Sequence, residues 1–189
     1  AQTAGGHLAY VFGTTFKQGR WYFYPAVAAV KTPVGVFLAL LVTTAAMLYR
    51  RRISTESFVV LVPAAIYATG CILSPIDLGV RILLPIYPLL YAFVALNLPG
   101  RKWNAAIVAC TVVLAIESAT IYPYYLAYFN AFSGGPTQGP RYLLDSNIDW
   151  GQDTKRLKGF LQSHGTNDAC TAYFGLAYPF YYHIVQLPW

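Results

Sequence analysis

Charged residues are scarce in this sequence. Only 11% of its 189 residues are charged and seven are acidic, whereas 57% are apolar. Soluble domains carry about 25% charged residues, so the composition argues against that class and favours a membrane protein. The excess of Lys and Arg does not indicate nucleic-acid binding, because these residues cluster beside long apolar runs, as membrane orientation signals do.

Cysteine and histidine are also rare. Cys71, Cys110 and Cys170 have no CxxC spacing and no Cys/His pairing, so the sequence does not support a disulfide framework or a zinc site. The three histidines stand apart from any nucleophile motif, which leaves a hydrolytic triad without support. The N-terminus lacks a secretory signal and a Met, and the chain stops abruptly, so we expect a piece of a longer protein.

Long apolar runs are the main feature that is present. A helix needs about 20 mostly apolar residues to cross a bilayer. The runs that approach this length are residues 32–49, 57–73, 78–98 and 104–121. They end at basic clusters, Gly or Pro, which are helix stop signals. We therefore predict a mainly α-helical polytopic membrane protein with about four transmembrane helices in residues 32–121.

The basic clusters predict the orientation of these helices. The cluster at residues 50–52 and the pair Arg101 and Lys102 lie on the same side if four helices cross. The positive-inside rule makes that side cytoplasmic. Residues 1–31, with an aromatic cluster suited to the membrane interface, and residues 122–189 then lie outside. Both ends of this chain are expected to be extracytoplasmic.

The composition changes after the fourth run. Residues 122–140 are aromatic and then rich in Gly and Pro, which predicts a segment along the membrane and then a turn. A phosphate-binding loop is disfavoured because GxxxxGK[ST] is absent. Residues 141–147 predict a strand, residues 149–165 an amphipathic helix and residues 169–178 a second strand. Residues 122–189 should therefore include a small, partial extracytoplasmic α/β unit.

The segment DSNIDWGQD gathers three of the seven acidic residues. Asp145, Asn147 and Asp149 match the first three ligand positions of an EF-hand calcium loop. Trp150 stands where the loop needs Gly, and Arg156 stands where it needs the closing Glu. No metal site is predicted here, and a divalent metal has no support from this pattern.

The same segment fits a strand followed by a helix. A carboxylate at Asp149 or Asp153 would satisfy the free amides at the start of the predicted helix. Asp145 and Asn147 would then lie at the carboxyl end of the strand, where α/β units present functional polar groups. A structural turn and a ligand contact both remain open for these two residues.

Two charged residues fall inside predicted spans. Glu117 lies about one turn from the outer end of the fourth span, where an unpaired carboxylate costs a few kcal/mol. Arg81 lies at a similar depth near the start of the third span. Either the two pair or face a common polar cavity, or each extends separately to the interface.

Several motifs together resemble one family. In order along the chain, they are WYFYPAVAAVKTP, LGVRILLPIYPLLY, YPYYLAYFNAFSGGPTQGPRYLLDSNIDWGQDTKRLKGFL and AYFGLAYPFYY. They are similar to the C-terminal half of bacterial family 39 glycosyltransferases, the group related to protein O-mannosyltransferases and lipid A aminoarabinose transferases. The family-motif residues in the most specific stretch are Asp145, Asn147, Asp149, Trp150, Gln152 and Asp153. Tyr122 departs from the family pattern, which often has His before this Pro.

The resemblance implies a multi-pass glycosyltransferase of the bacterial inner membrane. Such enzymes move a sugar from a polyprenyl-phosphate carrier to a protein or lipid acceptor on the extracytoplasmic face. The implied partners are the lipid bilayer and the carrier-linked sugar. No cofactor is firmly implied, and nucleic acid is not a partner.

The resemblance also suggests residues for the site. Arg81 and Lys31 are candidates for contact with the carrier phosphate, since guanidinium and ammonium groups bind phosphate well. Family members commonly have His after this Arg, where Ile82 stands here. The family's catalytic carboxylate lies in a first extracytoplasmic loop that no segment here matches. The catalytic residues are therefore unknown.

A non-catalytic membrane subunit derived from such an enzyme is the alternative. It would pack against other subunits of a membrane complex through its aromatic helices. A small transporter is a weaker hypothesis, because no internal repeat or pair of broken spans is evident. A natural polypeptide with a mass near the 20.9 kDa of this chain would argue against a fragment of an active transferase.

Overall fold

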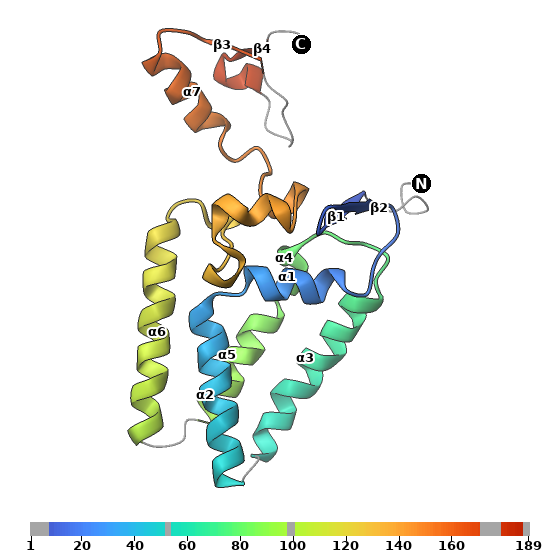
Figure 1. Ribbon diagram of the computed structural model, residues 1–189, viewed down its shortest axis with the longest axis vertical. Helices are drawn as coiled ribbons and strands as arrows, with labels where there is room; N and C mark the ends of the chain where they lie inside the picture. Colours follow the sequence, from blue (N-terminus) through green and yellow to red (C-terminus); the bar gives the residue numbers. More distant parts are fainter. Residues whose placement is uncertain (1–7, 52–53, 98–100, 171–178, 187–189) are drawn as a thin grey trace. The chain divides into compact units, whose positions relative to one another are not determined.

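A computed structural model describes residues 8–51, 54–97, 101–170 and 179–186 of the protein. The chain divides into two compact units, residues 1–147 and residues 148–189. The first unit is built mainly from long helices, and the second consists of one helix with short strands and turns (Figure 1). The candidate site lies in the first unit.

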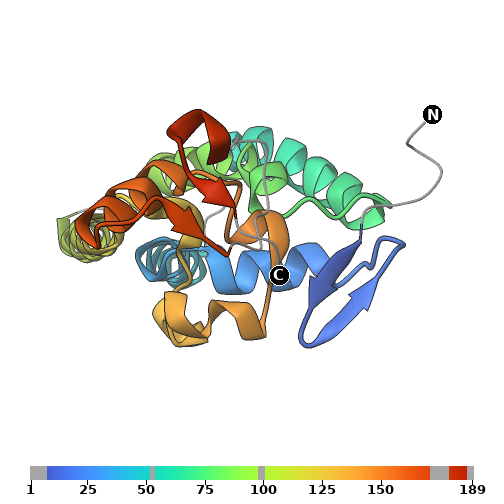
Figure 2. The same cartoon turned by 90° about the horizontal axis from the view of Figure 1, so that it is seen from above.

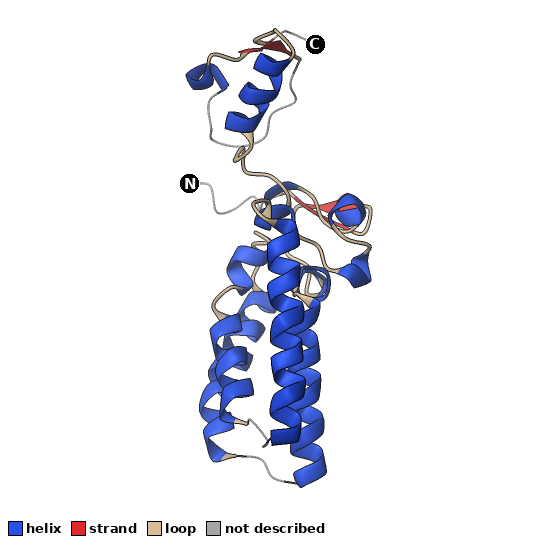
Figure 3. Cartoon of the chain, turned by 90° about the vertical axis from the view of Figure 1, so that its left-hand side faces the viewer, coloured by secondary structure: helices blue, strands red, loops and turns tan. Residues whose placement is uncertain are grey.

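The first unit begins with an antiparallel hairpin of β1 (Ala9–Val11) and β2 (Thr14–Phe16). The helices that follow are α1 (Phe23–Lys31), α2 (Val34–Arg50), α3 (Thr55–Leu73), α4 (Val80–Leu83), α5 (Ile86–Leu96) and α6 (Arg101–Ile121). Short 3-10 segments end the unit: η1 (Tyr125–Ala127), η2 (Ala131–Ser133), η3 (Pro136–Arg141) and η4 (Asp145–Asn147). The strands are short beside the helices (Figure 3).

In the part of the chain that the structure describes, two helices are long and apolar enough to cross a membrane. They are α3 and residues 103–121 of α6, which occupy the predicted second and fourth runs. Helices α1 and α2 reach this criterion only as a pair, bent by 100° at their junction. The number of candidate spans is therefore two, or three if the bent pair counts as one span. The fold is consistent with a helical membrane protein.

The predicted third span, residues 78–98, is divided in the structure. Pro85 lies between α4 and α5, and proline has no amide hydrogen to continue a helical ladder. Helix α5 has 11 residues, whereas a span needs about 20. Hydropathy overestimated the length of this helix because apolar residues continue on both sides of the break.

Helix α1 covers one end of the bundle. Figure 2 looks along the bundle axis, so α2 and α6 appear end-on. In this view α1 runs crosswise to them. Its buried residues include Phe23 and Val27, and it packs against α3 and α4. The name capped end is used below for α1 together with the segments η1 to η4.

Helices α2 and α6 pack closely along the bundle. A Cβ atom at Gly35 would lie 2.7 Å from the carbonyl oxygen of Cys110 and from the amide nitrogen of Leu114. Both atoms belong to the backbone of α6, so only glycine permits this approach. Helix α3 packs against α5 on the other side, where Ser57 and Asn97 are hydrogen bonded.

The second unit contains α7 (Thr154–Ser163), β3 (Asp168–Ala169), η5 (Pro179–Tyr182) and β4 (Val185–Gln186), with β3 and β4 paired in parallel. The predicted helix is confirmed, and it ends before Gly165, which has a φ of 71°. The predicted strand over residues 169–178 falls mostly on residues 171–178, which lie outside the described residues.

The predicted strand over residues 141–147 is wrong. These residues form 3-10 turns, with one isolated bridge from Leu143 to Val11. Asp145 has a φ of 59°, in the left-handed region that a strand does not use. Of the apolar pair before it, Leu143 is fully buried, whereas Leu144 is exposed.

Candidate functional site

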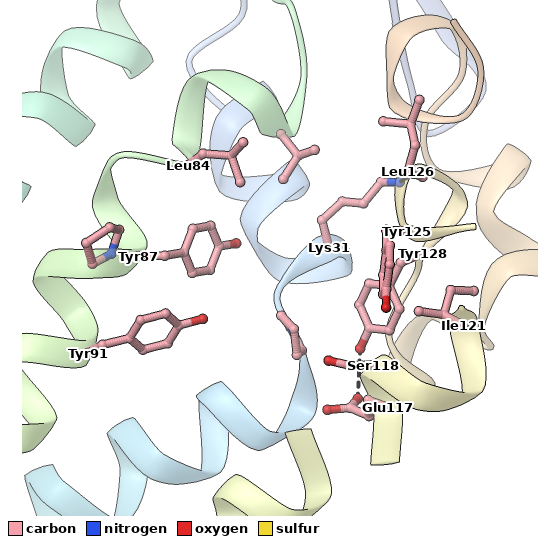
Figure 4. A pocket seen from close by; sticks show the side chains of 13 residues that line it. Lys31, Leu84, Tyr87, Tyr91, Glu117, Ser118, Ile121, Tyr125, Leu126 and Tyr128 are labelled. Atoms are coloured by element: carbon pink, nitrogen blue, oxygen red, sulfur yellow. Dashed lines mark hydrogen bonds between the residues drawn. The ribbon is translucent and has the colours of Figure 1, made fainter. Parts of the chain in front are cut away.

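A cavity of about 450 Å³, here named the upper cavity, opens beneath the capped end. Helix α5 contributes Tyr87 and Tyr91, helix α6 contributes Glu117, and the 3-10 region contributes Tyr128 (Figure 4). The hydroxyl groups of Tyr87 and Thr32 are 2.8 Å apart, which ties α5 to the junction of α1 and α2. The cavity therefore has aromatic walls with several hydroxyl groups.

Lys31 is the last residue of α1 and is only 5% exposed. Its Nζ donates to the carbonyl oxygens of Leu126, at 2.8 Å, and Asn147, at 2.5 Å. The same atom lies 3.8 Å from the centroid of the Phe129 ring, a cation–π geometry. Two of the three ammonium donors thus bind groups that lie 95 and 116 residues later in the chain.

Asn130 satisfies the end of α1. Its Nδ2 donates to the carbonyl oxygens of Ala29 and Thr32, at 2.7 and 2.9 Å, and its amide donates to that of Val30 at 2.9 Å. The last carbonyl groups of a helix have no partner within the helix. A fully buried asparagine supplies those partners here, so α1 can stop at Lys31 and the chain can turn into α2.

Glu117 of α6 satisfies the start of α2. Its two carboxylate oxygens accept from the amides of Val34 and Gly35, both at 3.0 Å, and from the Tyr128 hydroxyl at 2.7 Å (Figure 4). The first amides of a helix lack internal partners and carry partial positive charge, so a carboxylate suits this position. Burial, together with the Glu117 carboxylate, raises the pKa of Tyr128, which keeps its hydroxyl protonated as the donor.

The motif residue Asn147 fixes the start of α4. Its Oδ1 accepts from the amide of Val80 at 3.1 Å, and its Nδ2 donates to the carbonyl oxygen of Leu144 at 3.3 Å. Gly79 has a φ of 81°, and a Cβ atom there would lie 2.3 Å from Asn147 Oδ1. Glycine is required at position 79 because another residue would be strained at this φ and its Cβ atom would clash with Asn147. Asn147 thus connects two parts of the site: its side chain binds the start of α4, and its backbone carbonyl binds Lys31.

A second cavity of about 330 Å³, the lower cavity, lies between α2, α5 and α6. Its lining is almost entirely apolar and includes Ala39, Leu90, Val94 and Ile107. Tyr91 lines both cavities, so the two adjoin at this residue. Together they offer a largely apolar space whose upper end, beneath α1, also presents charged and hydroxyl side chains, which suits an amphiphilic ligand.

The structure brings some of the predicted site residues together. Lys31 and Asn147 are in direct contact, whereas Asp145 is exposed in the turn before it. Arg81 is exposed in α4. The hydrogen bonds of Glu117 go to α2 and to Tyr128, and its direct pairing with Arg81 stays a prediction.

The remaining motif residues belong to the second unit and make local contacts. Asp149 Oδ1 accepts from the Gly151 amide, and Gln152 Oε1 accepts from the Trp150 amide, both at 2.7 Å. These bonds form a turn. In the part of the chain that the structure describes, no group of three or more His, Cys, Asp or Glu residues could hold a metal ion.

The predicted carboxylate cap of α7 is not formed. Asp153 precedes the helix, but its side chain makes no hydrogen bond to the helix amides. The carboxylate pairs instead with Arg156 one turn later. The Asp149 carboxylate accepts a hydrogen bond within the preceding turn, so neither candidate acts as the cap of α7.

Sequence reasoning missed Tyr128, Phe129 and Asn130. The signal was present, because a polar Asn in an aromatic stretch needs partners when it is buried. The identity of those partners was not accessible, since Asn130 binds residues about 100 positions earlier. Asn130, like Lys31, acts on the junction of α1 and α2.

Comparisons with protein-family models, curated proteins and solved structures find no match to this chain. The two adjoining cavities and the residues that surround them are the features that bear on function. The described residues form a mainly helical fold with two or three candidate membrane spans.

Proposed function

We propose that this chain is the C-terminal part of a membrane glycosyltransferase. The enzyme would move a sugar from a polyprenyl-phosphate carrier to a protein or lipid acceptor on the extracytoplasmic face. In this proposal α2, α3, the α4–α5 pair and α6 each cross a bacterial inner membrane, and the capped end lies outside. The observation that carries the proposal is an upper cavity with Lys31, Glu117 and tyrosine side chains in a largely apolar wall, adjoining an almost entirely apolar lower cavity.

The upper cavity suits the polar head of the carrier. Its volume lies within the range of about 300 to 1,000 Å³ that is usual for ligand sites. Tyrosine rings present flat apolar faces with a hydroxyl at the tip, which match the faces and hydroxyl groups of a sugar. Lys31, which lines the upper cavity, and Arg81 in α4, which directly follows the lining residue Val80, are the proposed phosphate contacts.

The lower cavity suits part of an isoprenoid chain. An apolar chain gains little by leaving lipid for an apolar protein groove, because the two surroundings are alike. The affinity must then come from the polar head and from close packing of the chain against the helices. Small residues such as Gly35 and Ala39 leave the room for this packing.

Binding of undecaprenyl phosphate to the intact natural protein in lipid nanodiscs tests the proposal. Native mass spectrometry would compare this ligand with undecaprenol, which has the chain and no phosphate. We expect at least tenfold weaker binding of undecaprenol. Ala39→Trp, which fills the lower cavity, should also weaken binding tenfold, while Val59→Trp on an exposed face of α3 should not.

Equal binding of both lipids, or of both tryptophan variants, would contradict the proposal. Transfer activity of the intact protein then separates the enzyme from its alternative. A protein that binds the carrier, transfers no sugar and copurifies in a fixed complex would be the non-catalytic membrane subunit.

A further inference from the structure

Asp77 is a buried carboxylate outside the helices of the bundle. It lies in the segment of residues 74–79 between α3 and α4 and is 6% exposed. Its Oδ2 accepts from the amide of Arg20 at 3.2 Å. Its Oδ1 is buried and has no hydrogen-bond partner among the described residues. A charge in this position would be poorly satisfied.

The segment that carries Asp77 is docked on residues 19–24, which lead into the first turn of α1. The hydroxyl of Tyr24 donates to the carbonyl oxygen of Ile76 at 2.7 Å and accepts from the amide of Leu78 at 3.5 Å. A Cβ atom at Gly19 would lie 2.4 Å from the carbonyl oxygen of Ser74, so the two backbones are in close contact. Asp77 is enclosed by this contact.

The titratable groups around Asp77 do not neutralise it. Arg20 offers its amide, while its guanidinium lies 5.9 Å from the centroid of the Phe16 ring. Tyr24 of α1 is close enough to interact electrostatically with Asp77, and α3 brings Tyr67 and Cys71 close to Tyr24. Each of these three groups is neutral or anionic and offers no positive charge.

We infer that Asp77 is a proton-binding site that controls how tightly residues 74–79 dock on residues 19–24. The neutral carboxyl group can remain in the enclosed site. When it loses its proton to water, it becomes a buried charge, and one of its oxygens has no hydrogen-bond partner among the described residues. The docked form is then weakened relative to an open form in which water reaches the carboxylate. This inference does not depend on the proposed function.

The same segment leads directly into α4, which forms part of the wall of the upper cavity. Val80 lines that cavity and follows directly after Gly79. The carbonyl oxygen of Leu78 accepts from the Ser146 hydroxyl at 3.2 Å, which connects the segment to the turn that contains Asn147. A change in docking at Asp77 therefore reaches the residues that hold α4.

The direction of the pH effect follows from proton linkage. Burial raises the pKa of Asp77, and the Arg20 amide offsets only part of this effect. The docked form therefore binds the proton more tightly than the open form, and docking is strongest at low pH. As the pH rises from the ordinary carboxyl pKa of about 4 through the raised value, docking weakens by up to about tenfold per pH unit and then levels off.

Hydrogen exchange of the intact protein in detergent tests this inference. Protection of the amides of Arg20 and of residues 74 and 76–79 would be measured between about pH 4 and pH 8 and corrected for intrinsic exchange rates. We expect protection to fall with rising pH by up to about tenfold per unit. Asp77→Asn should abolish this slope. Glu56→Gln, at an exposed carboxylate in the first turn of α3, should retain it.

The inference would be overturned if protection still fell with rising pH in Asp77→Asn, or if it did not depend on pH in the wild-type protein. If Asp77→Asn does not fold, infrared spectroscopy of wild-type protein with isotope-labelled Asp gives a second test. A band of a protonated carboxyl group that persists to higher pH than the bands of exposed Asp residues supports the inference. The absence of such a band contradicts the inference. Neither result bears on carrier binding, so the two proposals can fail separately.

Discussion

At the scale of single residues, the break between α1 and α2 is held by polar side chains from distant parts of the chain. Asn130 satisfies the carbonyl groups at the end of α1, and Glu117 satisfies the amides at the start of α2. Lys31, at the end of α1, binds the backbone carbonyls of Leu126 and Asn147. Pro33 interrupts the helix locally, and specific hydrogen bonds from distant residues stabilise the bend of 100°.

Replacement of Glu117 tests this account. Glu117→Ala leaves the amides of Val34 and Gly35 and the hydroxyl of Tyr128 without their acceptor, so we expect a loss of about 3 kcal/mol in stability. Glu117→Gln retains one acceptor oxygen and should lose about half as much. Thermal unfolding in detergent measures both. Equal stability of Glu117→Ala and the wild-type protein would show that the carboxylate does not hold the junction.

Gly79 offers a matched comparison with another glycine. Gly79→Ala places a Cβ atom against Asn147 at a φ of 81°, and we expect a loss of about 1 to 3 kcal/mol. Gly70 lies in α3 with open space around it, so Gly70→Ala should stabilise the helix by up to about 1 kcal/mol. Chemical denaturation in mixed micelles compares the two variants, and a similar effect of both would refute the proposed role of Gly79.

At the scale of the helices, α2 and α6 approach each other closely at Gly35. Gly35→Ala would bring a Cβ atom to 2.7 Å from two backbone atoms of α6, so the helices must separate or shift. We expect a loss of about 1 to 3 kcal/mol, the usual cost of overpacking. Thermal unfolding measures it, again with Gly70→Ala as the control. Unchanged stability would indicate that α6 can move away without cost.

At the scale of the whole molecule, the membrane topology depends on whether the α4–α5 pair crosses. If it does, Ile76 and Thr137 lie on the outer side and Arg50 lies inside. If it does not, Thr137 lies on the opposite side from Ile76. We expect an impermeant maleimide to label Ile76→Cys and Thr137→Cys in spheroplasts, and to label Arg50→Cys only after permeabilisation.

The exposed Cys170 would be replaced by Ser in all three labelling variants. Labelling of Ile76→Cys without Thr137→Cys would show that α4 and α5 enter the membrane without crossing it. That outcome would remove the four-helix topology and leave the candidate spans α3 and α6 in place.

Some elements of the fold could be predicted from local pattern. The helices over residues 57–73, 104–121 and 154–163 follow from apolar runs or periodicity and clear stop signals. The strand predicted over residues 141–147 is wrong, because a short apolar run does not distinguish a strand from 3-10 turns that are buried by neighbouring segments. The α4–α5 break was missed because hydropathy does not register the effect of Pro85.

The sequence by itself determined that long apolar helices dominate the fold. Long apolar runs with few charges favour helices, because a helix satisfies its backbone groups internally, whatever the arrangement of the helices. Only the tertiary structure decided what the polar residues do. Lys31, Glu117 and Asn147 each bind groups more than 60 positions away, and such partners depend on how the helices pack, which local pattern does not encode.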